Sequence, residues 1–234
     1  MAARKKQTAR TEGSRARLLG AAVDLIRAKG YSATTVDDIC AASSLSKGAF
    51  FHHFESKEAC ALAAAGRFAF RADERFDAAP FMKLDDPRAR VLAYIDFRKS
   101  ILRGAPAEFT CLLGTIVQEA YETHPALRDA CGAHIEDHAQ RVAADLAAAK
   151  ALYAPGADWS PQSVAIFTQA VLQGAFVLAK AKHGADVAAG CLDQLRDYVE
   201  RLLPPAGADR RTAKRAQRSK SAAEKRRRSS STRQ

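Results

Sequence analysis

Residues 43–54 read SSLSKGAFFHHF, and this stretch decides how the surrounding chain should fold. Its first three residues form a turn of the length that joins two helices in a helix-turn-helix. Ser46 can cap a helix that follows the turn, because serine side chains accept hydrogen bonds from free amides at a helix start. Phe50 and Phe54 are four residues apart and share one helix face. We therefore expect a short helix anchored by two aromatic rings, with its other face exposed.

Helical spacing continues on the N-terminal side of this stretch. Residues 14–29 carry apolar side chains at i, i+4, i+7 and i+8, the stripe of an amphipathic helix: Leu18, Ala22, Leu25 and Ile26. Gly30 follows where a left-handed C-terminal cap belongs. Thr34 or Thr35 can cap a second helix over residues 36–43, whose early aspartates suit the positive end of the helix dipole. Sustained apolar–polar alternation is absent, so the chain is expected to be all-α.

The positive charge of the chain is concentrated toward its ends. The net charge is +11, and residues 204–234 alone contain 11 Lys and Arg against two carboxylates. This segment has almost no large apolar residue, so it is expected to be a disordered basic tail. It serves either as a solvated tail or as an arm that binds phosphates without sequence preference. Residues 1–13 are expected to form a second basic arm before the first helix, through Arg4, Lys5, Lys6 and Arg10.

Composition argues against several classes of protein. No run approaches 18 uncharged apolar residues and no signal peptide follows the N-terminal charges, so we expect a cytoplasmic protein with no membrane partner. The five cysteines are odd in number and form no CxxC pair, which argues against disulfides and structural zinc. Motifs of hydrolases, nucleotide-binding enzymes and zinc proteases are missing, so neither an enzyme nor a cofactor is expected.

The segment from 14 to 63 resembles the DNA-binding domain of the TetR family of transcriptional regulators. The elements that carry the resemblance occur in the family's order and spacing: Gly30-Tyr31, Thr35, Ile39, Ser46, Gly48, His53, Phe54 and Lys57. It implies an all-helical homodimer, with a three-helix helix-turn-helix domain over 14–63 and an effector-binding and dimerisation domain over 64–203. This sequence departs from the family pattern at three positions: Ser44 replaces a frequent glycine, Phe51 a phosphate-binding tyrosine, and Cys60 a common leucine.

The resemblance implies that the helix after the turn enters the major groove of double-stranded DNA. A dimer should bind a palindromic operator, because each subunit reads one half-site. The expected DNA-contacting residues are Thr34, Thr35, Ser46, Lys47, Gly48, Ala49, Phe51, His52 and Lys57. The adjacent histidines are not expected to share a metal, since neighbouring helical residues point about 100° apart. We expect His53 to pack or hydrogen-bond beneath the domain.

The C-terminal domain is expected to contain helices near 57–77, 88–104, 111–123, 126–152, 161–184 and 187–203. The last two carry wide apolar stripes, which either form a four-helix dimer interface or complete a monomer core. The expected effector-contacting residues are Tyr94, Phe97, Arg98, Cys111, Gln118, Tyr121, Phe167 and Gln173. His134 and His138 have a metal-ligand spacing, but without a third ligand a solvated or capping role is preferred.

These features predict a repressor that releases its operator when a small-molecule effector of unknown identity binds. One alternative is a nucleoid-type protein that binds DNA without sequence preference through its basic ends. Another is a thiol-based electrophile sensor, because the segment around Cys111 resembles the sensor segment of electrophile-responsive members of the family. A thiol in the first turn of a helix is activated by the dipole, and Arg103 could add to that field. The simpler interpretation of Cys111 is a buried packing residue.

Overall fold

The computed structural model describes residues 2–205, and it describes side chains from residue 13 onward. Within these limits the chain is helical and contains no strand, which confirms the all-α prediction. The helices are α1 (Ala2–Lys29), α2 (Val36–Ser43), α3 (Lys47–His53), α4 (Lys57–Asp77), η1 (Pro80–Lys83), α5 (Pro87–Ser100), α6 (Pro106–Phe109), α7 (Leu112–Ala120), α8 (Pro125–Tyr153), α9 (Pro161–Lys182) and α10 (Asp186–Leu202). Most of the basic tail predicted over 204–234 lies outside the described residues, so its disorder stays a prediction.

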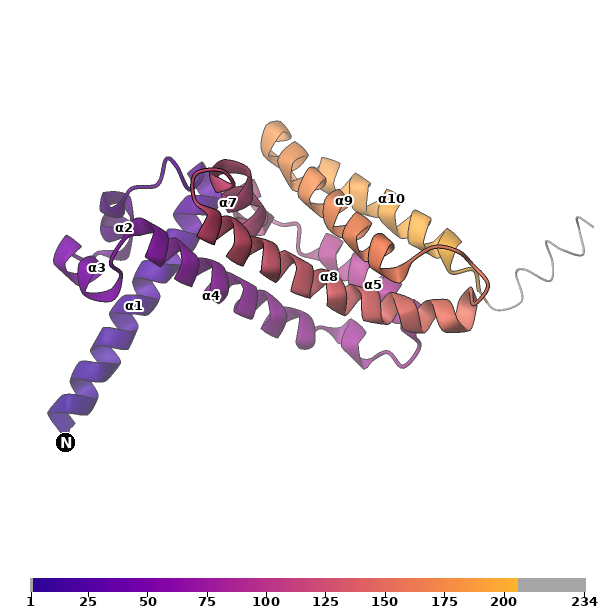
Figure 1. Cartoon of the computed structure of the whole chain (residues 1–234), viewed down its shortest axis with the longest axis horizontal. Coiled ribbons are helices and arrows are strands. Elements are labelled where there is room, and N and C mark those ends of the chain that lie inside the picture. Colours follow the sequence, from indigo (N-terminus) through magenta and orange to yellow (C-terminus); the bar gives the residue numbers. More distant parts are fainter. Residues whose placement is uncertain (1, 206–234) are drawn as a thin grey trace, which may run out of the picture.

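Helices α1, α2 and α3 form the helix-turn-helix domain at one end of the molecule (Figure 1). Phe50 is fully buried, and its ring centroid lies 5.6 Å from that of Phe54. Both rings belong to a cluster with apolar residues of the neighbouring helices: Leu18, Leu19, Ala22, Ile39, Cys40, Cys60 and Ala64. The two aromatic anchors predicted for the third helix are therefore confirmed.

The first helix begins at Ala2, well before the start expected near residue 14. The segment expected to be a separate arm therefore continues α1. Residues 2–13 read AARKKQTARTEG, in which alanine, arginine, lysine and glutamine are strong helix formers and proline is absent. Charge alone suggested an arm, whereas helix propensity extends the helix through it.

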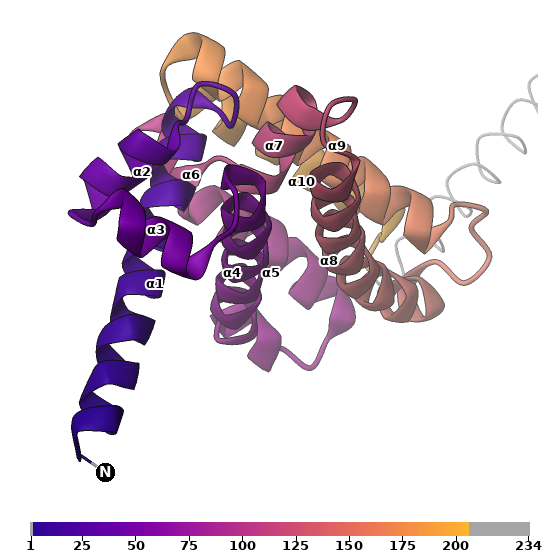
Figure 2. The same ribbon diagram turned by 60° about the vertical axis from the view of Figure 1, so that its left-hand side comes forward.

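The C-terminal domain is a helical bundle built on α8, which packs against α5, α7 and α9 (Figures 1 and 2). Helix α10 closes the bundle against α5 and α9. The core contains buried residues from α5, α8, α9 and α10, including Ile95, Leu146, Leu172 and Leu192. The buried residues of α7 belong to a separate cluster. The sequence missed the short α6 and extended the helix over 88–104 too far, because α5 ends at Ser100 and a turn follows that includes Gly104 at φ +80°.

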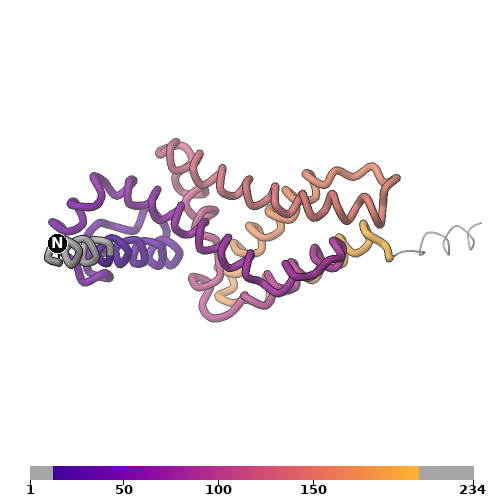
Figure 3. The backbone as a smooth tube through the Cα atoms, turned by 90° about the horizontal axis from the view of Figure 1, so that it is seen from below, coloured from indigo at the N-terminus to yellow at the C-terminus, as the bar shows by residue number. Residues whose placement is uncertain are grey.

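Helix α4 belongs to both domains. Cys60 and Ala64 lie in the helix-turn-helix core, whereas Phe76 lies in the core of the C-terminal bundle. Figure 3 shows the chain running in this helix from one domain to the other. A further cluster between the domains joins Ile26 of α1 and Ala65 of α4 to buried residues of α7 and α8. The two domains therefore share one continuous helix and an apolar junction.

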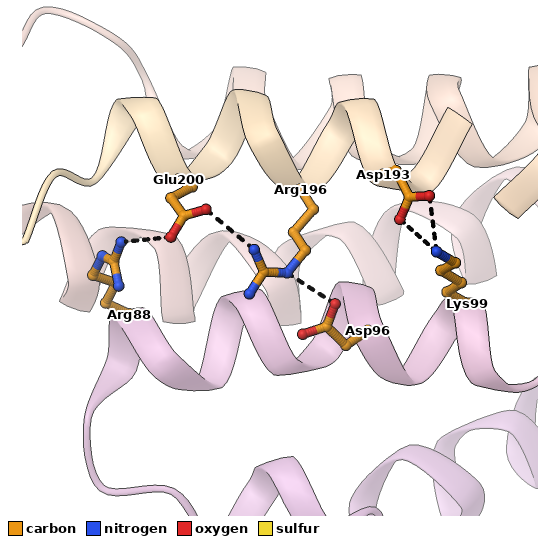
Figure 4. Close-up of polar contacts among 6 residues, drawn as sticks. All are labelled: Arg88, Asp96, Lys99, Asp193, Arg196 and Glu200. Atoms are coloured by element: carbon orange, nitrogen blue, oxygen red, sulfur yellow. Dashed lines mark hydrogen bonds and ion pairs between the residues drawn. The ribbon is translucent and has the colours of Figure 1, made fainter. Parts of the chain in front are cut away.

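Ion pairs hold α10 along the exposed side of α5 (Figure 4). Arg196 bridges Asp96 at 2.9 Å and Glu200 at 3.1 Å. On either side of it, Arg88 pairs with Glu200 at 3.2 Å and Lys99 with Asp193 at 2.6 Å. Exposed pairs of this kind contribute little individually, about 0–1 kcal/mol each, so the apolar core stabilises this helix pair and the charges set its register.

Helix α9 is the one described helix that is long and apolar enough to cross a membrane by length and composition, which the sequence did not lead us to expect. Its packing gives another reason for this composition. One face of α9 is buried in the core against α8 and α10. The opposite face exposes apolar side chains at the surface, among them Ile166, Phe167, Val177 and Leu178.

Candidate DNA-binding surface and effector cavities

The turn before α3 is held by a left-handed residue and by an arginine from α1. Ser44 adopts φ +52°, a conformation that ends α2 and turns the chain toward α3. Arg17 donates hydrogen bonds through Nη2 to the carbonyl of Ser43 and, at 3.2 Å, to that of Ser44. Carbonyls at a helix end lack helical partners, so Arg17 satisfies them and fixes the turn on α1. We had not predicted this role, because no local signal links Arg17 to carbonyls that lie 26 and 27 positions away in sequence.

The outer face of α3 brings six of the nine expected DNA-contacting residues together. The Ser46 side chain accepts a hydrogen bond from the Ala49 amide at 3.1 Å, which confirms it as the cap of α3. Ala49 is half-buried, and the other five are exposed: Ser46, Lys47, Gly48, Phe51 and His52. The Lys47 ammonium pairs with Asp37 at 2.8 Å, and this carboxylate raises the pKa of Lys47. Both side chains are largely exposed, so a phosphate could replace Asp37 as the partner.

Three expected residues lie apart from that face. Thr34 is fully buried and its hydroxyl donates to the Gly30 carbonyl at 2.6 Å, so the prediction that Thr34 contacts DNA is wrong. Thr35 is exposed and caps α2 in a capping box with Asp38. The Lys57 ammonium donates to the Tyr31 carbonyl at 3.1 Å and lies 4.2 Å from the centroid of its ring. Lys57 must therefore leave Tyr31 before it can reach a phosphate.

The adjacent histidines have different surroundings. His52 is exposed, whereas His53 is half-buried with a pKa lowered mainly by burial and further by His52 and Arg15. Their ring centroids lie 5.0 Å apart. From residue 13 to 205, no group of three or more His, Cys, Asp or Glu side chains is placed to hold a metal ion.

Two adjoining cavities open beside α4, α5 and the α6–α7 connection. The arginine cavity, of about 200 Å³, is lined by four arginines among apolar side chains: Arg27, Arg71, Arg75 and Arg98. The inner cavity, of about 80 Å³, is lined by residues that include His134 and Gln169. Both cavities share five lining residues, namely Phe68, Ala72, Phe76, Arg98 and Cys111. They therefore form one site with a wide charged part and a narrow inner part.

Two other cavities flank this site. The amide cavity, of about 240 Å³, lies between α7 and α9 and is lined by Gln118, Gln173 and Lys180 among others. The histidine cavity, of about 260 Å³, is lined by Tyr94 and His138 among others and shares Phe76 and His138 with the inner cavity. All four cavities lie in the C-terminal domain or at its junction with α1.

Comparison with known proteins identifies both halves of the chain. Residues 18–64 match the family described as bacterial regulatory proteins, tetR family, and residues 87–202 match the tetracyclin repressor-like C-terminal domain. This chain belongs to the TetR family. It is accordingly a DNA-binding transcriptional regulator. Members of the family are generally not enzymes.

Individual relatives of this TetR-family chain are distant. An uncharacterised HTH-type transcriptional regulator of Bacillus subtilis, YerO, is 44% identical over 48 residues, which cover 20% of this chain and 17% of YerO. A Chloroflexus aurantiacus TetR regulator has a TM-score of 0.72 at 28% identity, over 81% of this chain and 96% of that one. The reduced form of Escherichia coli NemR has a TM-score of 0.68 at 20% identity, over 82% and 99%, which shows a shared fold.

The residues expected to contact an effector are divided among these cavities and the surface. Arg98 and Cys111 line the arginine and inner cavities, Gln118 and Gln173 the amide cavity, and Tyr94 the histidine cavity. Phe97 lines none of these four cavities, because it packs in the core against Phe76 and Phe81. Tyr121 and Phe167 lie on the surface, each about half exposed, and they also line none of the four.

Cys111 lies at the N-cap of α7, one residue before the first turn in which we expected it. It is half-buried and lines three of the four cavities. Arg103 does not face it: that guanidinium is exposed and donates to the Ser100 carbonyl at 2.9 Å. The nearby cations are instead Arg27, which lines the arginine cavity with Cys111 and donates to the Thr110 carbonyl at 3.0 Å, and Lys180, which lines the amide cavity with Cys111.

His138 has a structural role that differs from the solvated one expected for it. It forms a 2.9 Å hydrogen bond with the Tyr94 hydroxyl, and its ring lies 4.7 Å from that of Phe76. Burial, with further contributions from Arg98 and Arg141, lowers its pKa to about 3. The imidazole is therefore neutral at neutral pH and acts as a hydrogen-bonding part of the core.

Proposed function

We propose that this chain is a homodimeric, cytoplasmic repressor that binds a palindromic operator through α3 and releases it when a small-molecule effector binds the C-terminal domain. The observation that carries the proposal is the exposed outer face of α3, which a buried Phe50 holds in place. A major groove about 12 Å wide admits one helix, and residues at its start reach base edges. Ser46, Lys47 and His52 are the polar groups available there.

The exposed apolar faces of α9 and α10 support a dimer. Ile166, Phe167, Val177, Leu178 and Tyr198 are each between 41% and 54% exposed, although all are large and apolar. The Phe167 and Tyr198 rings lie 5.2 Å apart, so the patch continues from one helix to the other. Water contact with such a patch is unfavourable, and a two-fold axis would bury the same patch on both subunits. The effector then acts by changing how far apart the two α3 helices lie.

Selection of bound sequences from a random DNA pool tests the proposal directly. A two-fold repressor should enrich an inverted repeat with half-sites about 34–36 Å apart, or a multiple of that distance. Lys47→Ala and His52→Ala should then weaken binding, and the lysine variant should lower the salt slope by about one unit. Lys83→Ala, an exposed lysine on η1, is the matched control. Wild-type affinity in both α3 variants would show that another surface contacts DNA.

The nucleoid-type alternative predicts a different outcome in the same assay. A regulator should prefer its operator over random DNA by at least about 10³-fold, whereas a nucleoid protein shows no preference. Truncation after Leu203 separates the two further. It should leave operator recognition intact and weaken only the binding to random DNA at low salt, because charge on the removed segment acts without sequence preference.

Cys111 supports a second route to release. Its half-buried position beside three cavities would let a small electrophile reach the thiol. Alkylation there would insert a group between α7 and the C-terminal bundle. The regulator would then respond to covalent modification in place of reversible binding.

A further inference from the structure

The four arginines of the arginine cavity come from three different helices. Arg27 comes from α1, Arg71 and Arg75 lie four residues apart on α4, and Arg98 comes from α5. Glu108 is the only carboxylate that lines the cavity, and its Oε2 already accepts a hydrogen bond from the Ala105 amide at 2.6 Å. The arginine cavity therefore has four arginines against one carboxylate. The inner cavity adds two carboxylates, Asp137 and Asp73, of which Asp73 already pairs with Arg141 at 2.8 Å.

Several other arginines of the C-terminal bundle form ion pairs, in contrast to the cavity arginines. Arg88, Arg90, Arg141 and Arg196 each lie within 4 Å of a carboxylate oxygen. Across residues 13–205, no such pair involves the three cavity arginines of α4 and α5. Within the same residues, Arg27 also has no carboxylate oxygen within 4 Å, and burial lowers its pKa although the charges of Asp24 and Glu108 act in the opposite direction. Arg71 and Arg75 are exposed, whereas Arg27 and Arg98 are half-buried. Like charges that are partly removed from water are unfavourable unless an anion joins them, so Arg27 and Arg98 carry most of this effect.

Two buried donors face the same space without an acceptor. The Thr110 side chain is 1% exposed and lines the arginine cavity, and its hydroxyl has no hydrogen-bond partner. Gln169 is 7% exposed and lines the inner cavity, and its Nε2 makes no hydrogen bond of normal geometry, although the side chain lies close enough to the Tyr94 hydroxyl to act on its pKa. Buried donors are nearly always paired in folded proteins, so an unpaired donor against a cavity indicates a missing acceptor. Oxygen atoms of a ligand could accept hydrogen bonds from both donors and from the guanidinium groups.

The remaining walls are aromatic. Arg98 lies over the rings of Phe76 at 5.1 Å and Phe176 at 5.9 Å, and Arg27 lies over Phe68 at 5.5 Å. These stacked guanidinium groups present their edges, which donate hydrogen bonds in a fork that matches a carboxylate. Cavities of about 200 and 80 Å³ are below the usual range for drug-sized ligands, about 300–1,000 Å³, so the occupant is small.

We propose that the arginine cavity binds a small monocarboxylate with an aromatic or branched apolar body. Its carboxylate would lie among Arg27, Arg71, Arg75 and Arg98, and its apolar body would lie between the phenylalanine rings. Because Arg27 belongs to α1 and holds the Thr110 carbonyl, the carboxylate would compete for a contact that joins the helix-turn-helix domain to α6 and α7. This regulatory part rests on the proposed effector-controlled release, whereas the binding part does not.

Ligand binding can be measured on the full chain with benzoate, phenylacetate and isovalerate, each against its neutral amide. The carboxylates should bind at least about tenfold more tightly than the amides, and Arg98→Met should abolish that difference. Arg196→Met, which removes a paired arginine of the same bundle, should leave it unchanged. Equal affinity for the acids and the amides would overturn the inference, and so would the absence of binding by all three carboxylates at a concentration of about 10 mM.

A carboxylate built into the wall gives a test that needs no ligand. Ala72 lines both cavities, so Ala72→Glu would place a carboxylate among the arginines, and Ala72→Gln would place a neutral group of the same size. The glutamate variant should have the higher thermal midpoint and should no longer bind benzoate. A midpoint no higher than that of the glutamine variant would refute the anion site.

Operator binding is scored separately in these variants. If benzoate binds but the operator is retained, the carboxylate site stands and effector-controlled release through it fails. If the operator is recognised but no carboxylate binds, the proposed DNA-binding function stands and the anion site fails.

Discussion

Replacing Gly30 with alanine should destabilise the folded chain by about 1–2 kcal/mol from the backbone alone, and by up to about 5 kcal/mol if a hydrogen bond to Glu119 is also lost. Gly30 adopts φ +91°, a region that costs an L-residue about 1–2 kcal/mol. A Cβ atom at this position would also lie 2.1 Å from Oε1 of Glu119, so the glutamate side chain would have to move. That carboxylate accepts a hydrogen bond from the Ser32 amide at 2.9 Å, and losing a charge-assisted bond costs about 1.5–3 kcal/mol when fully lost.

A double-mutant cycle separates the two contributions. In a Glu119→Ala background the clash is gone, so Gly30→Ala should cost only the backbone part, about 1–2 kcal/mol. Glu119→Gln is the matched control, because the amide has the same size and keeps the clash. Urea denaturation at one fixed protein concentration measures all of these variants, which keeps any dimer contribution constant. An equal cost of Gly30→Ala in the wild-type and Glu119→Ala backgrounds would refute the contact between the glycine and the carboxylate.

Ser44→Gly should raise the free energy of unfolding by up to about 1 kcal/mol, because Ser44 adopts φ +52°; a lower urea midpoint would contradict this. Treatment with N-ethylmaleimide should release the operator from wild type but not from Cys111→Ser, and identical responses would make Cys111 a packing residue. His138, with its pKa lowered from 6.5 to about 3, contributes stability that is complete above pH 6.5 and is lost as pH falls toward 3, by up to about 1.4 kcal/mol per pH unit. His138→Gln should reduce the dependence of the urea midpoint on pH across that range. An unchanged dependence on pH would exclude this role for His138.

Local signals predicted the helix-turn-helix domain well. A cap depends on residues close to one another in sequence, which is why Ser46 was placed correctly at the start of α3 and Thr35, one of two candidates, at the start of α2. Phe50 and Phe54 were correct for a similar reason, since their spacing defines one helix face. Thr34, the other candidate for that cap, is buried, and its hydroxyl pairs with the Gly30 carbonyl inside the domain, which is why it cannot contact DNA as expected.

Long-range contacts could not be predicted in the same way. Arg27 is one charged residue on α1, and its bond to the Thr110 carbonyl spans 83 positions of sequence. Nothing local distinguishes it from Arg103, which we had placed beside Cys111 because the two are close in sequence. Phe97, Tyr121 and Phe167 were correctly recognised as large apolar or aromatic residues, but residue type does not distinguish a cavity wall from a core or a surface.

The continuity of α4 bears on how such regulators can be recombined. Family similarity ends at residue 64 on one side and resumes at residue 87 on the other, which invites a splice between the two halves. Residue 64 lies within the helix, where Cys60 and Ala64 pack on one domain and Phe76 on the other. A chimaera joined at residue 64 would combine the two parts of α4 from different proteins, and their packing surfaces would not be matched to each other. A chimaera should fold if it takes all of α4 from the protein that supplies the C-terminal domain. Only the residues in the first two turns of α4 should then be changed to match the new helix-turn-helix domain.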